Sequence, residues 1–430
     1  MNKIQPIAVI AGARTPFSKA FTDMRGLSAV ELGRQSVLAA LKRASLAPRD
    51  VDELVMGNVS GPPDAANIAR VIALQAELPQ HKIAHTVNRN CASGMESILA
   101  GWRSIALRQA GLVVAGGTES MSGVPLLFHP QAAAVWMKLA KSKTWRQRLK
   151  AIGSFRPKHF KPVIGIELGL TDPVSGLNMG QTAEVLAREF SITREAQDRF
   201  ALESHQKAAA AQEKCFLSGE IAAVEHAGTA NVEKDNGPRH GQSMEQLARL
   251  RPIFDKDGSV TAGNSCPLTD GAAALVLAPA EEVGRFVSPP LGYVTHHAIA
   301  GCDPRRMGLG PVYATAKLLK QTGLRMSDFD LIEINEAFAA QVLACEQAFA
   351  SRAFAEQELG MSAAVGEVPE DRLNVHGGAI ALGHPVGTTG TRLILTLLRA
   401  LKVAGLRRGL ATLCVGGGQG VAMVVETELE

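Results

Sequence analysis

Cys91 has the residue type and the position expected of a nucleophile. It lies between an extended run at residues 83–87 and a run in which apolar residues, among them Met95 and Trp102, recur at helical spacing. We therefore expect Cys91 at a strand-to-helix turn, where unpaired N–H groups and the positive end of the helix dipole favour a thiolate. A buried structural cysteine is the alternative, because free cysteines are among the most buried residue types.

Three motifs toward the C-terminus supply further reactive groups. They are NEAFA at residues 335–339, NVHGGAIALGHPVGTTG at residues 374–390 and CVGGGQG at residues 414–420. Together they add an asparagine, a histidine and a second cysteine. This combination favours a catalytic role for Cys91 over a structural one.

Each motif alone is modest evidence, but all of them in this order are hard to obtain by chance. Through them the chain resembles the thiolase family, from about residue 6 to residue 426. Within the family it looks most like the β-subunit type of the fatty-acid oxidation trifunctional complex. Residues 141–156, 234–254 and 308–315 carry that narrower likeness.

The resemblance implies roles for the three side chains that react. Cys91 is the nucleophile and carries the acyl group as a thioester, while His384, whose backbone is fixed by the following proline, takes the Cys91 proton. Cys414 protonates the acetyl-CoA enolate during cleavage and removes the same proton during synthesis. A thiol, with an ordinary pKa of about 8.5, suits this exchange better than a carboxylate. His376 receives no fixed catalytic role, and we interpret it as structural.

The resemblance also implies which groups stabilise developing negative charge. Asn335 holds a water that, with the His384 ring, stabilises the thioester enolate, and the N–H groups of Cys91 and Gly416 stabilise the tetrahedral intermediate. Asn335 is in addition a candidate cap for a helix over residues 336–349. Relatives of the trifunctional type often have histidine at this position, whereas asparagine is the residue of the wider family.

Coenzyme A is implied as cosubstrate, with no other cofactor and no metal. Met179, Ala337 and Phe338 occupy positions that line the pantetheine tunnel in similar proteins. Cys266 stands where relatives usually have a serine that hydrogen-bonds the pantetheine chain, and Ser265 is beside it. Because a thiol is a weak donor, we expect this contact to be weaker here.

Composition argues against several other classes of protein. With 430 residues, 46% of them hydrophobic, the chain can bury a large core in two or three domains. No two of its six cysteines form a CxxC pair, which argues against a disulfide framework or a zinc site and favours a protein from a reducing compartment. We expect no transmembrane segment and no signal peptide, and we predict a cytoplasmic protein. A net charge of +4 is too small for a nucleic-acid binder unless the charge is concentrated in one region.

Strand-like and helical patterns alternate through the first 121 residues, which is typical of α/β layering. Strands are expected at residues 7–12, 53–59, 83–87 and 112–116, helices at 28–44, at 64–75 and after Cys91, and turns at 116–121. The second half repeats this plan, with residues 51–58 matching 329–335 and residues 111–117 matching 409–416. We predict a thiolase-like α/β fold of two duplicated βαβαβ-type halves, layered α-β-α-β-α, with the site at their junction.

The predicted N-terminal half comprises residues 1–121 and 251–285, and the predicted C-terminal half comprises residues 286–430. Between them, residues 122–250 lack long apolar strands and resemble the loop domain that covers the active site in thiolases. A polar amphipathic helix is expected there at residues 194–211.

Residues 124–163 form a basic insert with nine lysines and arginines, and no acidic residue occurs between Glu119 and Glu167. Aromatic and aliphatic residues alternate with these charges, as in amphipathic segments that lie on an anionic membrane or dock on a partner. The candidate partner is a hydratase-dehydrogenase α-type subunit. A solvated cover over the acyl tunnel is the alternative. By family resemblance we also expect a homo-oligomer.

The predicted activity is that of an acetyl-CoA C-acyltransferase, a 3-ketoacyl-CoA thiolase working by ping-pong acyl transfer in fatty-acid β-oxidation. A biosynthetic acetoacetyl-CoA thiolase is the nearest alternative. A decarboxylating ketosynthase needs no acid-base cysteine, so Cys414 argues against it. A catalytically silent lipid carrier or scaffold subunit has no need to keep all of the reactive residues.

Overall fold

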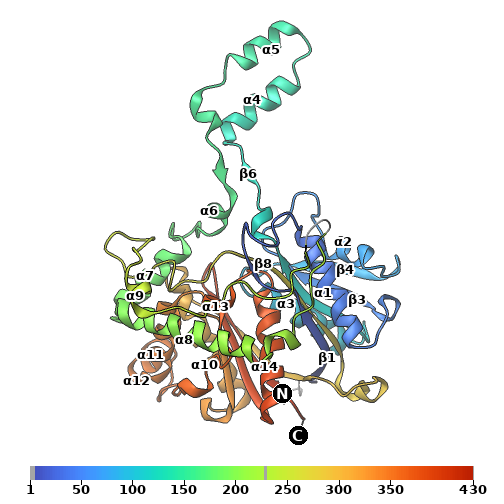
Figure 1. The fold of residues 1–430 in the computed structure, drawn as a ribbon, viewed down its shortest axis with the longest axis vertical. Helices are drawn as coiled ribbons and strands as arrows, with labels where there is room; N and C mark the ends of the chain where they lie inside the picture. Colours follow the sequence, from blue (N-terminus) through green and yellow to red (C-terminus); the bar gives the residue numbers. More distant parts are fainter. Residues whose placement is uncertain (1–4, 227–229, 430) are drawn as a thin grey trace. The chain divides into compact units, whose positions relative to one another are not determined.

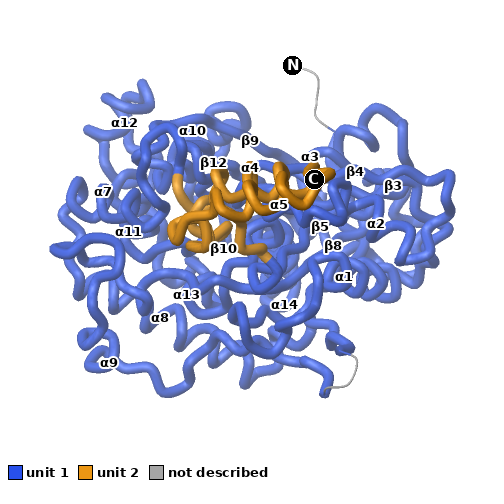
Figure 2. The backbone as a smooth tube through the Cα atoms, turned by 90° about the horizontal axis from the view of Figure 1, so that it is seen from above, with its two compact units in different colours: residues 1–123, 172–430 blue, residues 124–171 orange. Residues whose placement is uncertain are grey.

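The computed structural model describes residues 5–226 and 230–429. They form two compact units, one of residues 1–123 with 172–430 and one of residues 124–171 (Figure 2). The three-part domain division expected from the sequence stays a prediction, because these units follow different boundaries.

The first unit is built on one large sheet with the strand order β10-β11-β12-β9-β1-β8-β5-β3-β4. The strands are β1 (Ile7–Arg14), β3 (Glu53–Gly57), β4 (Ile83–Val87), β5 (Val113–Glu119), β8 (Thr269–Pro279), β9 (Gly292–Gly301), β10 (Leu331–Ile334), β11 (Arg408–Val415) and β12 (Gln419–Glu426). A short strand, β2 (Ser18–Lys19), pairs with β8 beside this path.

The strand order repeats on either side of the β1–β9 pair. In the first half β3 and β5 are parallel and β5, β8 and β1 are antiparallel neighbours. In the second half β10 and β11 are parallel, and β11, β12 and β9 are antiparallel neighbours. Leu373 forms a parallel bridge to β10, just as β4 runs parallel to β3. The repeat seen in the sequence is therefore a repeat of strand order.

Helices cover both faces of each half and give three apolar cores (Figure 1). In the first half, α1 (Ala29–Arg43) and α2 (Ile68–Gln75) pack on the outer face. In the second half, α10 (Gly310–Thr322) and α11 (Ala339–Ala350) do the same. The central core holds α3 (Ser93–Ala106) and α14 (Thr389–Ala404) between strands of both halves. This is the predicted α-β-α-β-α layering.

Local sequence accounts for most helix boundaries. Ser28 and Glu31 form a capping box at the start of α1, which agrees with the helix start expected near residue 28. Thr193 caps α8 (Arg194–Glu213) through the N–H of Ala196. Gly405 ends α14 in the left-handed conformation, which glycine adopts without strain.

Three sequence expectations were wrong in detail. The turns expected at residues 116–121 are mostly strand, because β5 continues to Glu119 in register with β8. The helix expected from residue 64 begins at Ile68, where Asn67 supplies the cap. Asn335 does not cap α11, which begins at Ala339, because the preceding segment is held in extended contact with residues 264–266.

The remaining helices of the first unit are α7 (Met179–Glu189), α9 (Met244–Ala248), α12 (Arg352–Glu358) and α13 (Ala379–Leu382). The second unit contains β6 (Leu126–Leu127), α4 (Pro130–Ala140), α5 (Trp145–Ile152), β7 (Val163–Ile164) and α6 (Gly165–Gly169). Its two strands pair antiparallel, and Trp136 packs edge-on against Phe155 with 5.0 Å between ring centroids. Within the described chain, every helix falls short of the length or apolar character that crossing a bilayer requires.

Candidate active site

Cys91 lies in the turn between β4 and α3, at the predicted strand-to-helix position. Asn90 precedes it with a φ of 44° and donates its Nδ2–H to the Gly416 carbonyl at 2.7 Å. That bond ties the turn before α3 to the loop after β11, which belongs to the other half. The Cys91 turn is thus held in place by a segment more than three hundred residues away in sequence.

The helices that begin beside this turn approach each other through two glycines. A Cβ on Gly94 in α3 would lie 2.6 Å from the Thr391 backbone nitrogen, and a Cβ on Gly390 in α14 would lie 2.5 Å from the Met95 nitrogen. Only residues without a side chain allow this distance. The N-terminal ends of α3 and α14 therefore meet, and both point positive dipole ends toward the junction of the halves.

The Cys91 thiol is protonated at rest. Burial of its sulfur raises the pKa of Cys91, the backbone N–H groups of Gly416 and of Cys91 itself act in the opposite direction, and the Glu119 charge raises the pKa further. The thiolate expected from the helix-start position is therefore wrong for the resting protein, because desolvation outweighs the N–H groups. A nucleophilic role for Cys91 would therefore require a separate base.

His384 has the protonation state that such a base needs. Its Nδ1 lies 2.6 Å from the Thr389 hydroxyl, and that hydroxyl donates to the Pro385 carbonyl at 3.2 Å. The hydroxyl proton is thus committed, so Nδ1–H donates to Thr389 and the lone pair is on Nε2. Among the described residues, Nε2 has no hydrogen-bond partner. Burial and the charge of Arg392 lower the pKa of His384 to about 4, so the ring is neutral.

Asn335 and Cys414 lie at the carboxyl ends of the parallel strands β10 and β11. The Asn335 N–H donates to the Thr412 carbonyl at 3.0 Å, which puts Asn335 and Cys414 on neighbouring strands at the edge where ligands bind in α/β sheets. Asn335 is fully buried, yet neither its Oδ1 nor its Nδ2 bonds another described residue. Such an amide is available to a water or a substrate oxygen.

The structure brings three thiols together. Burial raises the pKa of Cys414 well above the ordinary value, and nearby Cys91, Cys345 and Cys266 raise it further. Burial, then the influence of Cys91, raises the pKa of Cys266 to about 12. Cys91, Cys266 and Cys414 therefore interact within one site, and all three are protonated at rest.

The residues expected to line the CoA tunnel also gather here. Met179, Ala337, Phe338 and Cys414 share one apolar cluster. The Cys266 N–H donates to the Ala337 carbonyl at 3.1 Å, which ties Cys266 to that wall. Ser265 donates its hydroxyl to the Thr261 carbonyl at 2.7 Å, so this hydroxyl proton is already used within the protein.

The triple glycine after Cys414 is required by its turn. Gly417 and Gly418 have φ values of 90° and 82°, which favour glycine. A Cβ on Gly418 would lie 2.3 Å from the Cys302 carbonyl oxygen, and one on Gly416 would lie 3.1 Å from the Met179 sulfur. The turn directs the Gly416 N–H at Cys91 and leaves room beside Met179.

Sequence reasoning missed two residues that organise the site. Thr389 sets the His384 tautomer, and its position five residues after His384 within the Gly-rich motif was the available signal. Glu119 accepts from Ser60, Val59 and Asn58 of the first half and from the Gly387 N–H at 2.9 Å in the second. Since every partner donates, Glu119 acts as a carboxylate, although burial raises its pKa.

His376 lies outside this cluster of groups. Its ring stacks on Phe216 with 3.6 Å between centroids, and burial lowers its pKa. The predicted structural role fits this packing. Among residues 5–226 and 230–429, no group of three or more histidine, cysteine or acidic side chains is arranged to hold a metal ion.

Two family models match consecutive parts of the sequence. Residues 7–281 match the thiolase N-terminal domain and residues 288–427 match the thiolase C-terminal domain. The chain belongs to the thiolase family. This thiolase is 40% identical over 425 residues to the 3-ketoacyl-CoA thiolase of Yersinia enterocolitica, covering 98% of this chain and 97% of the relative.

Solved structures agree with the assignment. The Bacillus anthracis acetyl-CoA acetyltransferase superposes with a TM-score of 0.86 at 36% identity, over 100% of both chains. Human mitochondrial 3-ketoacyl-CoA thiolase in complex with CoA superposes with a TM-score of 0.84 at 34% identity, over 99% of both chains. The fold and acyltransferase class predicted from the sequence are confirmed.

Proposed function

We propose that this chain is an acetyl-CoA C-acyltransferase that cleaves a 3-ketoacyl-CoA with CoA to acetyl-CoA and a shortened acyl-CoA. The observation that carries the proposal is a neutral His384, with its Nε2 lone pair unpaired among the described residues, in the same junction as the protonated thiols of Cys91 and Cys414. The names of relatives that match nearly the whole chain support the same reaction.

The first half-reaction uses one proton donor and one acceptor. His384 Nε2 takes the Cys91 proton, and the thiolate attacks the 3-keto carbonyl, whose oxyanion accepts from the N–H groups of Cys91 and Gly416. The carbon–carbon bond breaks toward the thioester, and the enolate oxygen is stabilised by a water on Asn335 and by His384. Cys414 gives its proton to the enolate carbon, which releases acetyl-CoA and leaves the acyl group on Cys91.

The second half-reaction restores every proton. The Cys414 thiolate takes the proton of incoming CoA, whose sulfur attacks the acyl thioester. Cys91 leaves as a thiolate and recovers its proton from His384. Met179, Ala337 and Phe338 form the apolar wall for the pantetheine chain, with Ser265 and Cys266 beside it. Coenzyme A is the cosubstrate, and the scheme uses no other cofactor.

A thiolysis assay across 3-ketoacyl-CoA chain lengths tests the proposal. Cleavage of medium or long chains supports β-oxidation. Activity confined to acetoacetyl-CoA supports the biosynthetic alternative, which similarity to the acetyl-CoA acetyltransferase structures favours. Absence of thiolysis and of condensation, with the protein folded, would contradict the proposal and leave the silent scaffold.

The remaining assignments belong to the same proposal. The halves 1–121 with 251–285 and 286–430, joined by a loop domain at 122–250, form a homo-oligomer of the trifunctional β-subunit type. Six free cysteines support a reducing, cytoplasmic location.

The basic insert 124–163 would dock on a hydratase-dehydrogenase α-type subunit or on an anionic membrane. Its support is exposure of large apolar side chains between the positive charges, including Phe128 at 65% and Trp145 at 66%. The test compares wild type with a variant in which Lys141, Lys143, Arg146 and Arg148 are changed to Glu. Salt-sensitive co-sedimentation with anionic vesicles, lost in the variant, supports the membrane, and loss of α-type subunit capture supports the partner. No difference in either assay would contradict both.

A further inference from the structure

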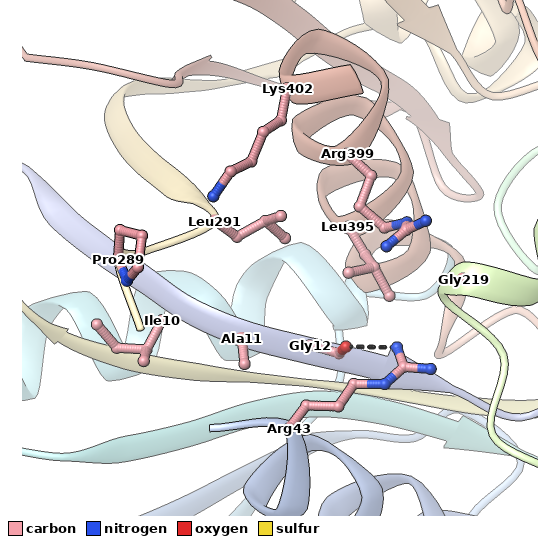
Figure 3. Close-up of a pocket in the computed structure, with 10 residues that line it drawn as sticks. All are labelled: Ile10, Ala11, Gly12, Arg43, Gly219, Pro289, Leu291, Leu395, Arg399 and Lys402. Atoms are coloured by element: carbon pink, nitrogen blue, oxygen red, sulfur yellow. Dashed lines mark hydrogen bonds between the residues drawn. The ribbon is translucent and has the colours of Figure 1, made fainter. Parts of the chain in front are cut away.

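A cavity of about 190 Å³ in the first unit lies between β1, the C-terminal part of α14 and the loop around Gly219 (Figure 3). Its ten lining residues include none of the groups in the candidate active site. Three of these are basic and none is acidic. We propose that this cavity binds a phosphate-type oxyanion, held by Arg43 and Arg399, with Lys402 adding positive charge from the other end.

Positive charge exceeds negative charge around the cavity. Glu220 is the carboxylate that acts on both Arg43 and Arg399, and its Oε2 lies 4.0 Å from Arg399 Nε. The same carboxylate also accepts from the buried Arg14 at 2.6 Å and from the Thr396 hydroxyl at 3.0 Å. Arg14 also pairs with Asp235 at 2.6 Å. Glu220 and Asp235 supply two negative charges. The four cations in and beside the cavity are Arg14, Arg43, Arg399 and Lys402, so two positive charges remain.

The excess positive charge acts on the guanidinium groups of Arg43 and Arg399. Desolvation and the Arg399 charge lower the pKa of Arg43, while desolvation and the Arg14 charge lower the pKa of Arg399 against the opposing effect of Glu220. A bound oxyanion relieves both costs, because it supplies negative charge and hydrogen-bond acceptors where water has been displaced.

Several N–H donors remain for such an anion. The Arg43 guanidinium donates to the carbonyls of Gly12 at 2.9 Å, Glu220 at 3.0 Å and Ile221 at 2.9 Å, which leaves two of its five donors. Arg399 donates to the Phe216 carbonyl at 3.3 Å and its Nε lies 4.0 Å from Glu220 Oε2, which leaves the other N–H groups of its two terminal nitrogens. Lys402 uses one of its three donors on the Pro290 carbonyl.

Packing sets where these donors point. A Cβ on Gly219 would lie 2.0 Å from Arg399 Nη2, so glycine at this position lets the guanidinium lie flat against the loop. Figure 3 shows the Arg43 and Arg399 side chains reaching the same end of the cavity from opposite sides, while the Lys402 amino group lies toward Pro289 at the other end, with Leu291 in between. The two planar guanidinium groups at one end of the cavity suit a phosphate group better than a halide, because a halide offers no separate oxygen acceptors.

Titration calorimetry and thermal unfolding of the full chain with inorganic phosphate test the proposal, with sodium chloride at equal ionic strength as the reference. We expect phosphate, but not chloride, to bind and to raise the melting temperature with saturation. Arg399→Gln and Lys402→Gln should each weaken phosphate binding, roughly tenfold for the arginine because it removes charge-assisted bonds. Lys320→Gln, on an exposed turn of α10, is the matched control and should bind like wild type.

The outcomes separate the sources of the anion. Equal binding of inorganic phosphate and of glycerol 3-phosphate means that the site recognises the phosphate group alone, and tighter binding of the ester means that the apolar wall contributes. Equal effects of phosphate and chloride, or full binding by both Arg399→Gln and Lys402→Gln, would overturn the site. Lys402 is exposed, so its variant remains informative if Arg399→Gln fails to fold. Binding is measured without turnover, so the result is independent of the proposed activity.

Discussion

The turn that leads into α3 and the turn that leads into α14 hold equivalent places in the two halves, but they carry different chemistry. Both helices start without a side-chain cap and meet through Gly94 and Gly390. The first turn presents a thiol under backbone N–H groups, and the second presents a neutral imidazole whose tautomer is set by Thr389. One backbone arrangement, used twice, thus holds the proposed nucleophile and its proposed base.

Removing the nucleophile tests this comparison most severely. Cys91→Ala should lower thiolysis on the order of 10⁴-fold or more, because no acyl-enzyme can form. Mass spectrometry after incubation with acetyl-CoA should show an acetyl adduct on the Cys91 peptide of the wild type. Cys215→Ala, at an exposed cysteine, is the control and should keep full activity. An adduct found only on another cysteine would contradict the assignment.

Removing the second thiol should separate two activities. Cys414→Ala should lose carbon–carbon cleavage by roughly 10²- to 10⁴-fold, because the enolate then has no proton donor. Exchange of an acetyl group between Cys91 and CoA moves no carbon-bound proton, and His384 can carry the proton between the two sulfurs, so this exchange should decrease much less. Both rates are measured with labelled CoA on the same preparation. An equal loss of cleavage and exchange would show that Cys414 does not have a separate role.

Thr389→Val should remove the hydrogen bond between the Thr389 hydroxyl and His384 Nδ1 while preserving the shape of the side chain. Without the hydroxyl, the Nδ1 tautomer of His384 is no longer favoured, and we expect kcat to decrease roughly 10- to 100-fold with little change in KM. Thr389→Ser keeps the hydroxyl and should restore most of the rate. A serine variant as slow as the valine variant would mean that the threonine acts only by packing.

The contact between the two helix starts can be tested by adding one methyl group. Gly94→Ala places a Cβ 2.6 Å from the Thr391 nitrogen, so backbone atoms must shift, and we expect a loss of about 1–3 kcal/mol in unfolding free energy. Gly284→Ala, where no atom lies within 4 Å of the new Cβ, is the control. Chemical denaturation compares the two. An unchanged Gly94→Ala protein would mean that the helices separate at no cost.

The pH profile offers the smallest but most specific effect. His384 has a lowered pKa of about 4, so it loses its function as a base only when the pH falls through about 4. Burial raises the pKa of Cys91, so the thiol is replaced by a thiolate only above its ordinary range. The kcat/KM profile should therefore be flat from about pH 5 to pH 8. An acid limb near 6.5 in the free enzyme would mean that the ring is solvated.

Much of the fold was predictable because strands and helices depend on local patterns. The strand at Ile83–Val87 matches the expected range, and α1 starts where Ser28 predicts a cap. The boundaries that failed depend on distant partners, as β5 does when β8 extends it to Glu119. In the site, motif order predicted which residues carry reactive groups. Glu119 was interpreted as part of a turn, because its partners, Asn58 and Gly387, lie far from it in sequence.

The sequence by itself determined the family, the order of the reactive residues and the start of the helix after Cys91, because these follow from residue type and short-range spacing. Tertiary structure decided the protonation states. Desolvation keeps Cys91 a thiol although the helix start favours a thiolate, and burial with Arg392 keeps His384 neutral. It also brought Arg43 and Arg399 to one cavity. Proton affinity and charge balance depend on the groups that enclose a side chain in space, which for these residues come from both halves of the chain.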